Sequence, residues 1–139
     1  MPRNENLSAE QHEQNRDVRG ELFHAHVPVI KVVSGVLKAK NWDEVPAELK
    51  DKLRPTIESL KNNPSFIHHS QVPYVGSAAS ECLSVLEQES FGRLAPAKKH
   101  AAIKPHLQRL LDLLEASQMQ HTAMSAYHGT QAGRLRNAR

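Results

Sequence analysis

The chain has 139 residues, of which 39% are hydrophobic, 24% are charged and only 4% are aromatic. This length fits one domain, which can bury about two-thirds of its unfolded surface without support from a metal or a disulfide. The scarcity of aromatic residues disfavours a β-sheet core, and it disfavours a surface that binds single-stranded nucleic acid by stacking bases on rings. We therefore predict a core of Leu, Val, Ile and Ala in which helix packs on helix.

The charge is unevenly distributed along the chain, although the net charge is only +3. Residues 1–94 contain 11 Lys and Arg against 13 Asp and Glu, whereas residues 95–139 contain seven against two. This asymmetry suggests an anionic partner for the C-terminal part. The competing interpretation is a solvated helix face followed by a tail that keeps the chain soluble.

Nothing in the sequence indicates a disulfide, a secretion signal or a membrane span. Cys82 is the only cysteine, which excludes an intramolecular disulfide and a cysteine-based zinc site. The first 14 residues are polar and do not resemble a signal peptide. The longest apolar run, 27–37, contains polar residues and is shorter than the roughly 20 residues that a span needs. We expect a cytoplasmic protein, or one inside a particle assembled there, with no membrane contact.

The first helix is predicted to begin after Ser8, because Gln11 stands three residues later at capping-box spacing. Pro28 removes a backbone donor, so we expect a kink or a break there. A short β-strand over 27–33 is the alternative, since that segment is rich in β-branched residues. The apolar stripe of the predicted helix has a helical period and comprises Val18, Leu22, Ala25, Val29, Val33 and Val36.

Residues 41–46 are predicted to start a second helix, with Asp43 as its cap and Pro46 early in its first turn. Pro55 lies inside the pattern, which leaves open two short helices that meet near Arg54. The apolar stripe of this segment consists of Leu49, Leu53, Ile57 and Leu60.

Residues 64–76 lack a regular pattern and are predicted to form a long loop. A third helix is predicted from Ser77 to about Ser90, with Gly92 as a left-handed C-terminal cap.

Pro96 is predicted to open the last and longest helix, which we expect to end at Gly129. No heptad pattern of apolar residues persists long enough to predict a coiled coil. The segment 129–139 is expected to be a mobile, extended tail unless it is bound. The apolar stripe of the helix consists of Ile103, Leu107, Leu110, Leu111 and Leu114.

The predicted fold is therefore an all-α bundle of about four helices with a long loop (64–76) and extended polar termini. Its expected divisions are a polar N-terminal arm at 1–7, a helical bundle domain at 8–128 and a basic C-terminal tail at 129–139.

The sequence offers little catalytic or metal-binding chemistry. No two of the nine histidines lie four residues apart on one helix, so no metal and no cofactor are predicted. The histidines are interpreted as surface or half-buried residues, although His121 and His128, seven apart, could share a helix face. Ser77 lacks the setting of a nucleophile elbow, and Cys82 falls on the predicted buried face of its helix. We therefore expect that the chain is not an enzyme.

The basic end is the remaining candidate for function. Lys98 and Lys99 stand in the first turn of the last helix, where the helix dipole disfavours cations. The arginines of the predicted tail would suit an extended segment laid along phosphates. The candidate anion-binding or nucleic-acid-binding residues are Lys98, Lys99, Lys104, Arg109, Arg134, Arg136 and Arg139.

Two functions are consistent with this sequence. The first is a non-catalytic helical subunit of a larger assembly, such as a virion or a nucleoprotein particle, which docks on other protein subunits through its termini. The alternative is an accessory protein that binds nucleic acid through residues 95–139.

Overall fold

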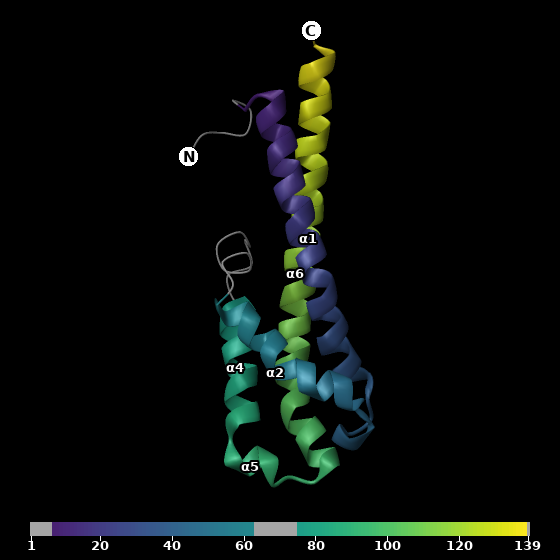
Figure 1. Ribbon diagram of the computed structural model, residues 1–139, viewed down its shortest axis with the longest axis vertical. Helices are drawn as coiled ribbons and strands as arrows, with labels where there is room; N and C mark the ends of the chain where they lie inside the picture. Colours follow the sequence, from purple (N-terminus) through teal and green to yellow (C-terminus); the bar gives the residue numbers. More distant parts are fainter. Residues whose placement is uncertain (1–6, 63–74, 139) are drawn as a thin grey trace.

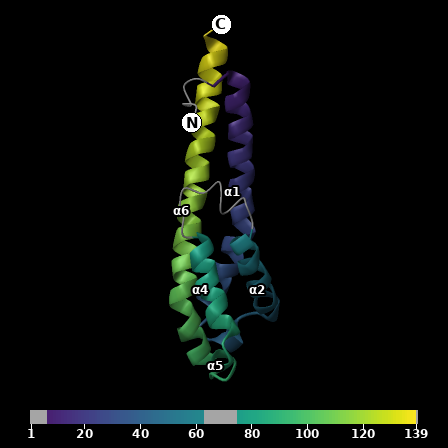
Figure 2. The same ribbon diagram turned by 90° about the vertical axis from the view of Figure 1, so that its left-hand side faces the viewer.

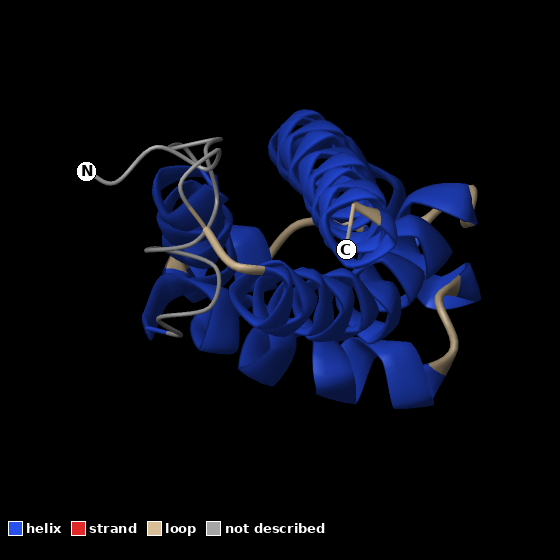
Figure 3. Cartoon of the chain, turned by 90° about the horizontal axis from the view of Figure 1, so that it is seen from above, coloured by secondary structure: helices blue, strands red, loops and turns tan. Residues whose placement is uncertain are grey.

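The computed structural model describes residues 7–62 and 75–138, and helices are the only regular elements in this part of the chain (Figure 3). The predicted all-α class is therefore confirmed. The predicted arm at 1–7 and the predicted loop at 64–76 lie almost entirely outside the described residues. The elements are α1 (Ala9–Lys38), the 3-10 turn η2 (Trp42–Glu44), α2 (Ala47–Asn62), α4 (Val75–Glu87), α5 (Glu89–Gly92) and α6 (Pro96–Asn137).

The two longest helices, α1 and α6, run antiparallel and lie side by side (Figures 1 and 2). Helices α2 and α4 pack against one end of this pair and form a four-helix bundle with it. At the other end, α1 and α6 continue as a pair, and the start of α1 lies at the same tip as the end of α6 (Figure 1). We call this projecting pair, residues 9–27 and 117–137, the stem, and the rest the bundle.

Helix α1 begins at the predicted capping box. The backbone N–H of Gln11 donates to the Ser8 hydroxyl at 3.1 Å, and the Ser8 N–H donates to the Gln11 side chain at 2.8 Å. The predicted break at Pro28 and the alternative strand over 27–33 are both wrong, because one helix runs through to Lys38. Pro28 is exposed, whereas Val29 and Val33 are buried in the core. Packing of the buried face therefore holds the helix together across the missing donor.

The segment before α2 differs from the prediction. Asn41, and not Asp43, is the capping residue, since its side chain accepts from the Glu44 N–H at 3.1 Å. The cap starts only the short turn η2, and α2 itself begins at Ala47. The possibility of two helices meeting near Arg54 is wrong, because α2 is continuous through Pro55.

The third predicted helix is divided in two by Gln88, so that α4 ends at Glu87 and α5 begins at Glu89. Phe91 on α5 is buried and meets the Trp42 ring edge-on, at 5.5 Å between centroids. This contact joins η2 to α5 at the end of the bundle. Gly92 does not adopt the predicted left-handed conformation, since no described glycine has a positive φ.

Helix α6 begins at Pro96 as predicted, but it does not end at Gly129. It continues to Asn137, so the expected extended tail is instead part of a helix about 63 Å long at 1.5 Å per residue. Ala132 is buried, and Arg136 is bound to Glu13 of α1. Contacts with α1 therefore keep the last turns helical, which the local sequence did not reveal.

The apolar core lies in the bundle, between α1, α2, α4 and α6. The predicted stripes of α2 and α6 are confirmed at their central positions, where Leu53, Ile57, Leu107 and Leu110 are at most 1% exposed. Cys82 of α4 is fully buried among them, as its predicted face implied. Val18 is the exception in the predicted stripe of α1, because its side chain is 45% exposed on the stem.

Candidate functional site

The stem is held together by polar residues rather than by an apolar seam. The residues concerned form a row between α1 and α6, and five of the six are at most 3% exposed. Arg19, the sixth, is partly buried. We call this row the histidine seam; it consists of His12, Arg19, His26, Ser117, His121 and His128.

His12 and His128 meet near the tip of the stem. Their Nδ1 atoms are 2.9 Å apart, and the ring centroids are 5.2 Å apart. Because one nitrogen must donate and the other accept, this contact holds a single proton between the two rings. The Tyr127 ring lies edge-on to His12 at 6.2 Å and covers one side of the pair.

Arg19 and His121 form the next contact along the seam, with 3.0 Å between Arg19 Nη1 and His121 Nδ1. A guanidinium only donates hydrogen bonds, so His121 Nδ1 must be the acceptor. The imidazole of His121 is therefore neutral, with its proton on Nε2.

His26 occupies the inner end of the seam. Its Nδ1 donates to the Leu22 carbonyl oxygen at 2.7 Å, and its Nε2 lies 2.9 Å from the Ser117 hydroxyl. With its proton on Nδ1, the neutral ring accepts a hydrogen bond from Ser117 at Nε2. The His121 ring packs against it at 5.2 Å between centroids, so the two rings link adjacent levels of the seam.

The environment of the seam opposes positive charge. Burial lowers the pKa of His26, although its hydrogen bond to Leu22 acts in the other direction. Burial also lowers the pKa of His128, and the nearby His12 and Arg19 lower it further. Arg19 is itself partly desolvated, and burial lowers its pKa as well. The closed stem therefore disfavours the protonated forms of His26 and His128.

A spacing of seven residues explains why these side chains share a seam. On α1, His12, Arg19 and His26 are seven residues apart, and the series continues to the buried Val33. Antiparallel helices whose inward residues repeat every seven positions keep one face in contact over many turns. On α6, the corresponding buried series is His100, Leu107, Leu114, His121 and His128.

The interpretation of the histidines as surface or half-buried residues is wrong for five of them, which are buried. Counting apolar residues alone hid the seven-residue pattern, because its stem positions are polar. The seven-residue spacing of His121 and His128 was the one local sign of this shared face, and the structure places both against α1. Their partners on α1 are more than 100 residues away in sequence, so no local motif connects them.

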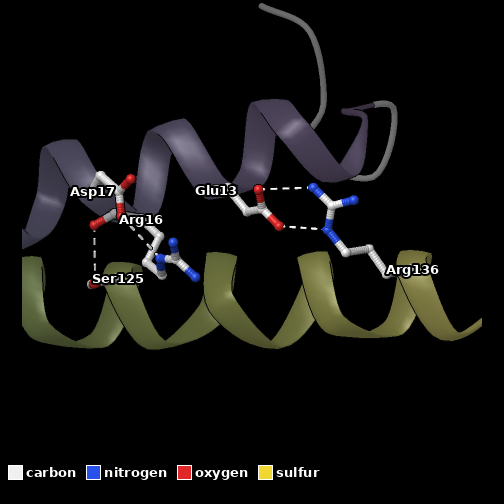
Figure 4. A network of polar contacts seen from close by, with 5 residues as sticks. All are labelled: Glu13, Arg16, Asp17, Ser125 and Arg136. Carbon is white, nitrogen blue, oxygen red and sulfur yellow. Dashed lines mark hydrogen bonds and ion pairs between the residues drawn. The ribbon is translucent and has the colours of Figure 1, made fainter.

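Two ion pairs lie on the stem (Figure 4). Arg136 donates two hydrogen bonds to the carboxylate of Glu13, at 2.5 and 2.8 Å. This pairing lowers the pKa of Glu13 and raises that of Arg136. Arg16 bonds to its neighbour Asp17, and the Ser125 hydroxyl donates to the Arg16 carbonyl at 3.1 Å. Both helices of the stem therefore contribute to a polar border around the seam.

A groove with a volume of about 620 Å³ runs along one side of the stem between α1 and α6. Small side chains form much of its wall, and Phe23 supplies an apolar surface. Gly20 and Gly129 lie at this wall, and the side chain of Arg16 approaches the position of a Cβ on Gly129 to 3.4 Å. The remaining residues along the groove are His24, Thr122, Ser125, Ala126 and Thr130.

The predicted anion-binding residues do not gather on one surface. Lys98, Lys99 and Lys104 lie near the start of α6 in the bundle, whereas Arg134 and Arg136 lie at the stem tip. Arg109 donates to Glu81 at 2.7 Å, and Arg136 is bound to Glu13. Among the described residues, Lys98, Lys99, Lys104 and Arg134 make no ion pair; Arg139 lies outside them. Nucleic-acid binding by these residues stays a prediction.

Within the described ranges, no group of three or more His, Cys, Asp or Glu side chains is placed to hold a metal ion. Over the same ranges, no helix combines the length and the apolar character that crossing a bilayer requires. Comparison of the chain with protein-family models, with curated proteins and with solved structures finds no match.

Proposed function

We propose that this chain is a non-catalytic subunit of a larger protein assembly, and that it docks on another subunit through the outer surface of its stem. One observation carries this proposal. Among the described residues, every large hydrophobic side chain that is exposed lies on the stem. These side chains are Val18, Val27, Met119, Tyr127 and Leu135, with Met119 72% exposed.

The partner that fits the groove of the stem is an amphipathic helix of another protein. Two packed helices present a groove between them, and a third helix can lay its apolar face into such a groove. The small residues along the groove, such as Gly20 and Gly129, allow a helix to approach closely. The start of α1 and the end of α6 lie at the same tip (Figure 1), so this proposal keeps the expected docking through the terminal region and extends it to the sides of the stem.

The division of the basic residues favours protein docking over the nucleic-acid alternative. Phosphate contacts strengthen binding when several cations follow one backbone. Here the cations of α6 lie in two groups near opposite ends of a helix about 63 Å long, and Arg136 is bound to a carboxylate. A surface of this kind offers a nucleic acid few contacts at a time.

Site-specific photo-crosslinking in the native host cell tests the docking surface. A photoreactive amino acid at Met119 on the stem is expected to give one discrete protein adduct. The matched control is Ala101, an exposed position in the bundle part of the same helix. Substitution Tyr127→Lys in the Met119 derivative should abolish the adduct. An adduct that forms equally from position 101, or that survives Tyr127→Lys, would contradict the proposal.

Electrophoretic mobility shifts at two salt concentrations test the nucleic-acid alternative. We expect weak binding that Arg134→Ala together with Arg136→Ala barely changes. Tight binding at low salt, with a salt dependence that this double substitution clearly reduces, would favour the alternative and overturn our choice.

A further inference from the structure

We infer that the histidine seam makes the stem acid-labile, so that mild acid separates α1 from α6 in the stem while the bundle stays folded. This inference concerns the isolated chain and does not depend on what docks at the stem.

The hydrogen bonds of the seam give the first reason. His121 Nδ1 accepts from the Arg19 guanidinium at 3.0 Å, so a proton on this atom would remove the acceptor and place two cations side by side. The contact between His12 and His128 already holds one proton between two nitrogens 2.9 Å apart. A second proton there would set two donors against each other. Each contact therefore requires an unprotonated ring nitrogen as its acceptor, and acid protonates that nitrogen.

The charged surroundings give the second reason. Besides the seam itself, the described titratable groups nearby include Glu10, Glu13, Arg16 and Asp17 on α1, with Tyr127 and Arg136 on α6. The carboxylates of Glu13 and Asp17 are bound by Arg136 and Arg16 on the outside of the stem. The described carboxylates of the stem are exposed or half-buried, so none lies inside the seam to compensate a protonated imidazole. The described residues of helices α2 and α4 belong to the bundle, and these helices place no further titratable side chain beside the seam.

The pKa directions give the sign of the effect. The pKa values of His26 and His128 are lowered from the ordinary 6.5 in the closed stem, mainly by burial. An opened stem returns both rings to water, where each takes up a proton near its ordinary pKa. The open form therefore binds more protons below pH 6.5, and the closed form loses stability as the pH falls from there towards the lowered pKa values.

The core of the bundle differs from the histidine seam. It is formed by apolar side chains such as Leu107, Leu110 and Leu114, which do not titrate. His100, the buried histidine described in the bundle, lies with Nε2 3.0 Å from the Val36 carbonyl oxygen. A carbonyl only accepts, so Nε2 is the donor in this bond, and the bond does not depend on an acceptor nitrogen of the ring. Acid should therefore act on the stem first.

Hydrogen exchange of the full chain at pH 7.5 and pH 5.5, corrected for the intrinsic pH dependence of exchange, measures the opening of each region. Each histidine whose lowered pKa returns to 6.5 on opening can raise the opening constant by at most about tenfold over this interval. His26 and His128 together should raise it measurably for stem amides, by at most about a hundredfold. Amides of α4 should keep their protection. Equal stem protection at both pH values, or simultaneous loss of protection in the stem and α4, would overturn the inference.

A pair of variants identifies the groups responsible. His26→Gln together with His128→Gln keeps polar side chains in the seam but removes two titrations, so the acid effect should become clearly smaller. The matched control is His24→Gln, an exposed histidine two residues from His26, which should leave the effect unchanged. If the double variant does not fold, nuclear magnetic resonance titration of the native imidazoles decides the question. Ordinary pKa values for His26 and His128 would then refute the inference.

Discussion

The Cys82 thiol lies inside the bundle, where burial, with a smaller effect from Glu81, raises its pKa from 9.0 to about 12. At pH 8 this shift lowers the thiolate fraction about a thousandfold, and the thiolate is the reactive form. We expect the folded chain to resist alkylation at pH 8 for hours and to react quickly in denaturant. Mass spectrometry of alkylated samples measures this difference. Rapid labelling of the folded chain would mean that α4 opens independently of the rest.

The pair of Glu13 and Arg136 connects the first turns of α1 to the last turns of α6. Its hydrogen bonds lower the pKa of Glu13, so the pair stabilises the stem above the ordinary glutamate pKa of 4.5 and is lost as the pH falls through the lowered value. Substitution Arg136→Gln should raise the pKa of Glu13 towards 4.5. Carboxyl carbon titration by nuclear magnetic resonance measures this change, with the separate pair of Glu48 and Lys52 as an internal control. An unchanged Glu13 pKa would show that the pair is not formed in solution.

At the scale of the element, the start of α1 depends on one hydroxyl group. Substitution Ser8→Ala removes the acceptor for the Gln11 N–H and should destabilise the first turns by about 1 kcal/mol. Exchange rates of amides near Gln11 provide the measurement. Ser84→Ala, at an exposed position of α4, is the control and should have no such effect. Equal effects of the two substitutions on these exchange rates would contradict a stabilising role of the Ser8 cap.

Substitutions at the glycines of the groove, Gly20 and Gly129, should affect the stability of the chain and its docking in opposite directions. A Cβ on Gly20 would meet Ser125 at 4.0 Å, and one on Gly129 would meet Arg16 at 3.4 Å, so alanine fits at both positions. Each substitution to alanine should stabilise the free chain by about 0.5–1 kcal/mol through helix propensity, as measured by chemical denaturation.

The same substitutions should weaken the crosslink from Met119, because they reduce the space in the groove. Gly133→Ala is the control, since its Cβ meets nothing within 4 Å and Gly133 does not line the groove. Unaltered crosslinking in all three variants would show that the groove is not part of the docking surface.

The elements show where sequence patterns suffice. The capping box at Ser8, the proline start of α6 and the stripe centred on Leu53 and Leu107 follow from local spacing, and the structure confirms them. Internal prolines misled the prediction, since Pro28 and Pro55 were expected to interrupt helices that tertiary packing keeps whole. The end of α6 was also wrong, because the contacts that extend it come from the start of α1.

At the scale of the whole molecule, the candidate site was beyond local prediction. The basic residues were visible in the sequence, yet the structure divides them between the two ends of α6. The histidine seam, by contrast, exists only once α1 and α6 are antiparallel and in register, because its pairs, such as His12 with His128, join distant residues. A seven-residue search that counted polar as well as apolar residues would have shown the two series. Their pairing would still have required the fold.

The polar seam also implies unequal stability along the molecule, and one substitution pair tests this. Replacing both His12 and His128 by Leu turns the outer contact of the seam into apolar packing like that of the bundle. Replacement of both partners of a buried polar contact by apolar groups of similar size is often neutral or stabilising, whereas removal of one partner costs about 1–3 kcal/mol.

We therefore expect His12→Leu alone to loosen the stem and the double variant to close it, most clearly at pH 5.5. Stem protection in hydrogen exchange provides the measurement, and amides of α4 serve as the reference within each sample. The two substitutions should be strongly non-additive, because the side chains are in direct contact at 2.9 Å. Additive effects would mean that the two histidines do not act as a unit.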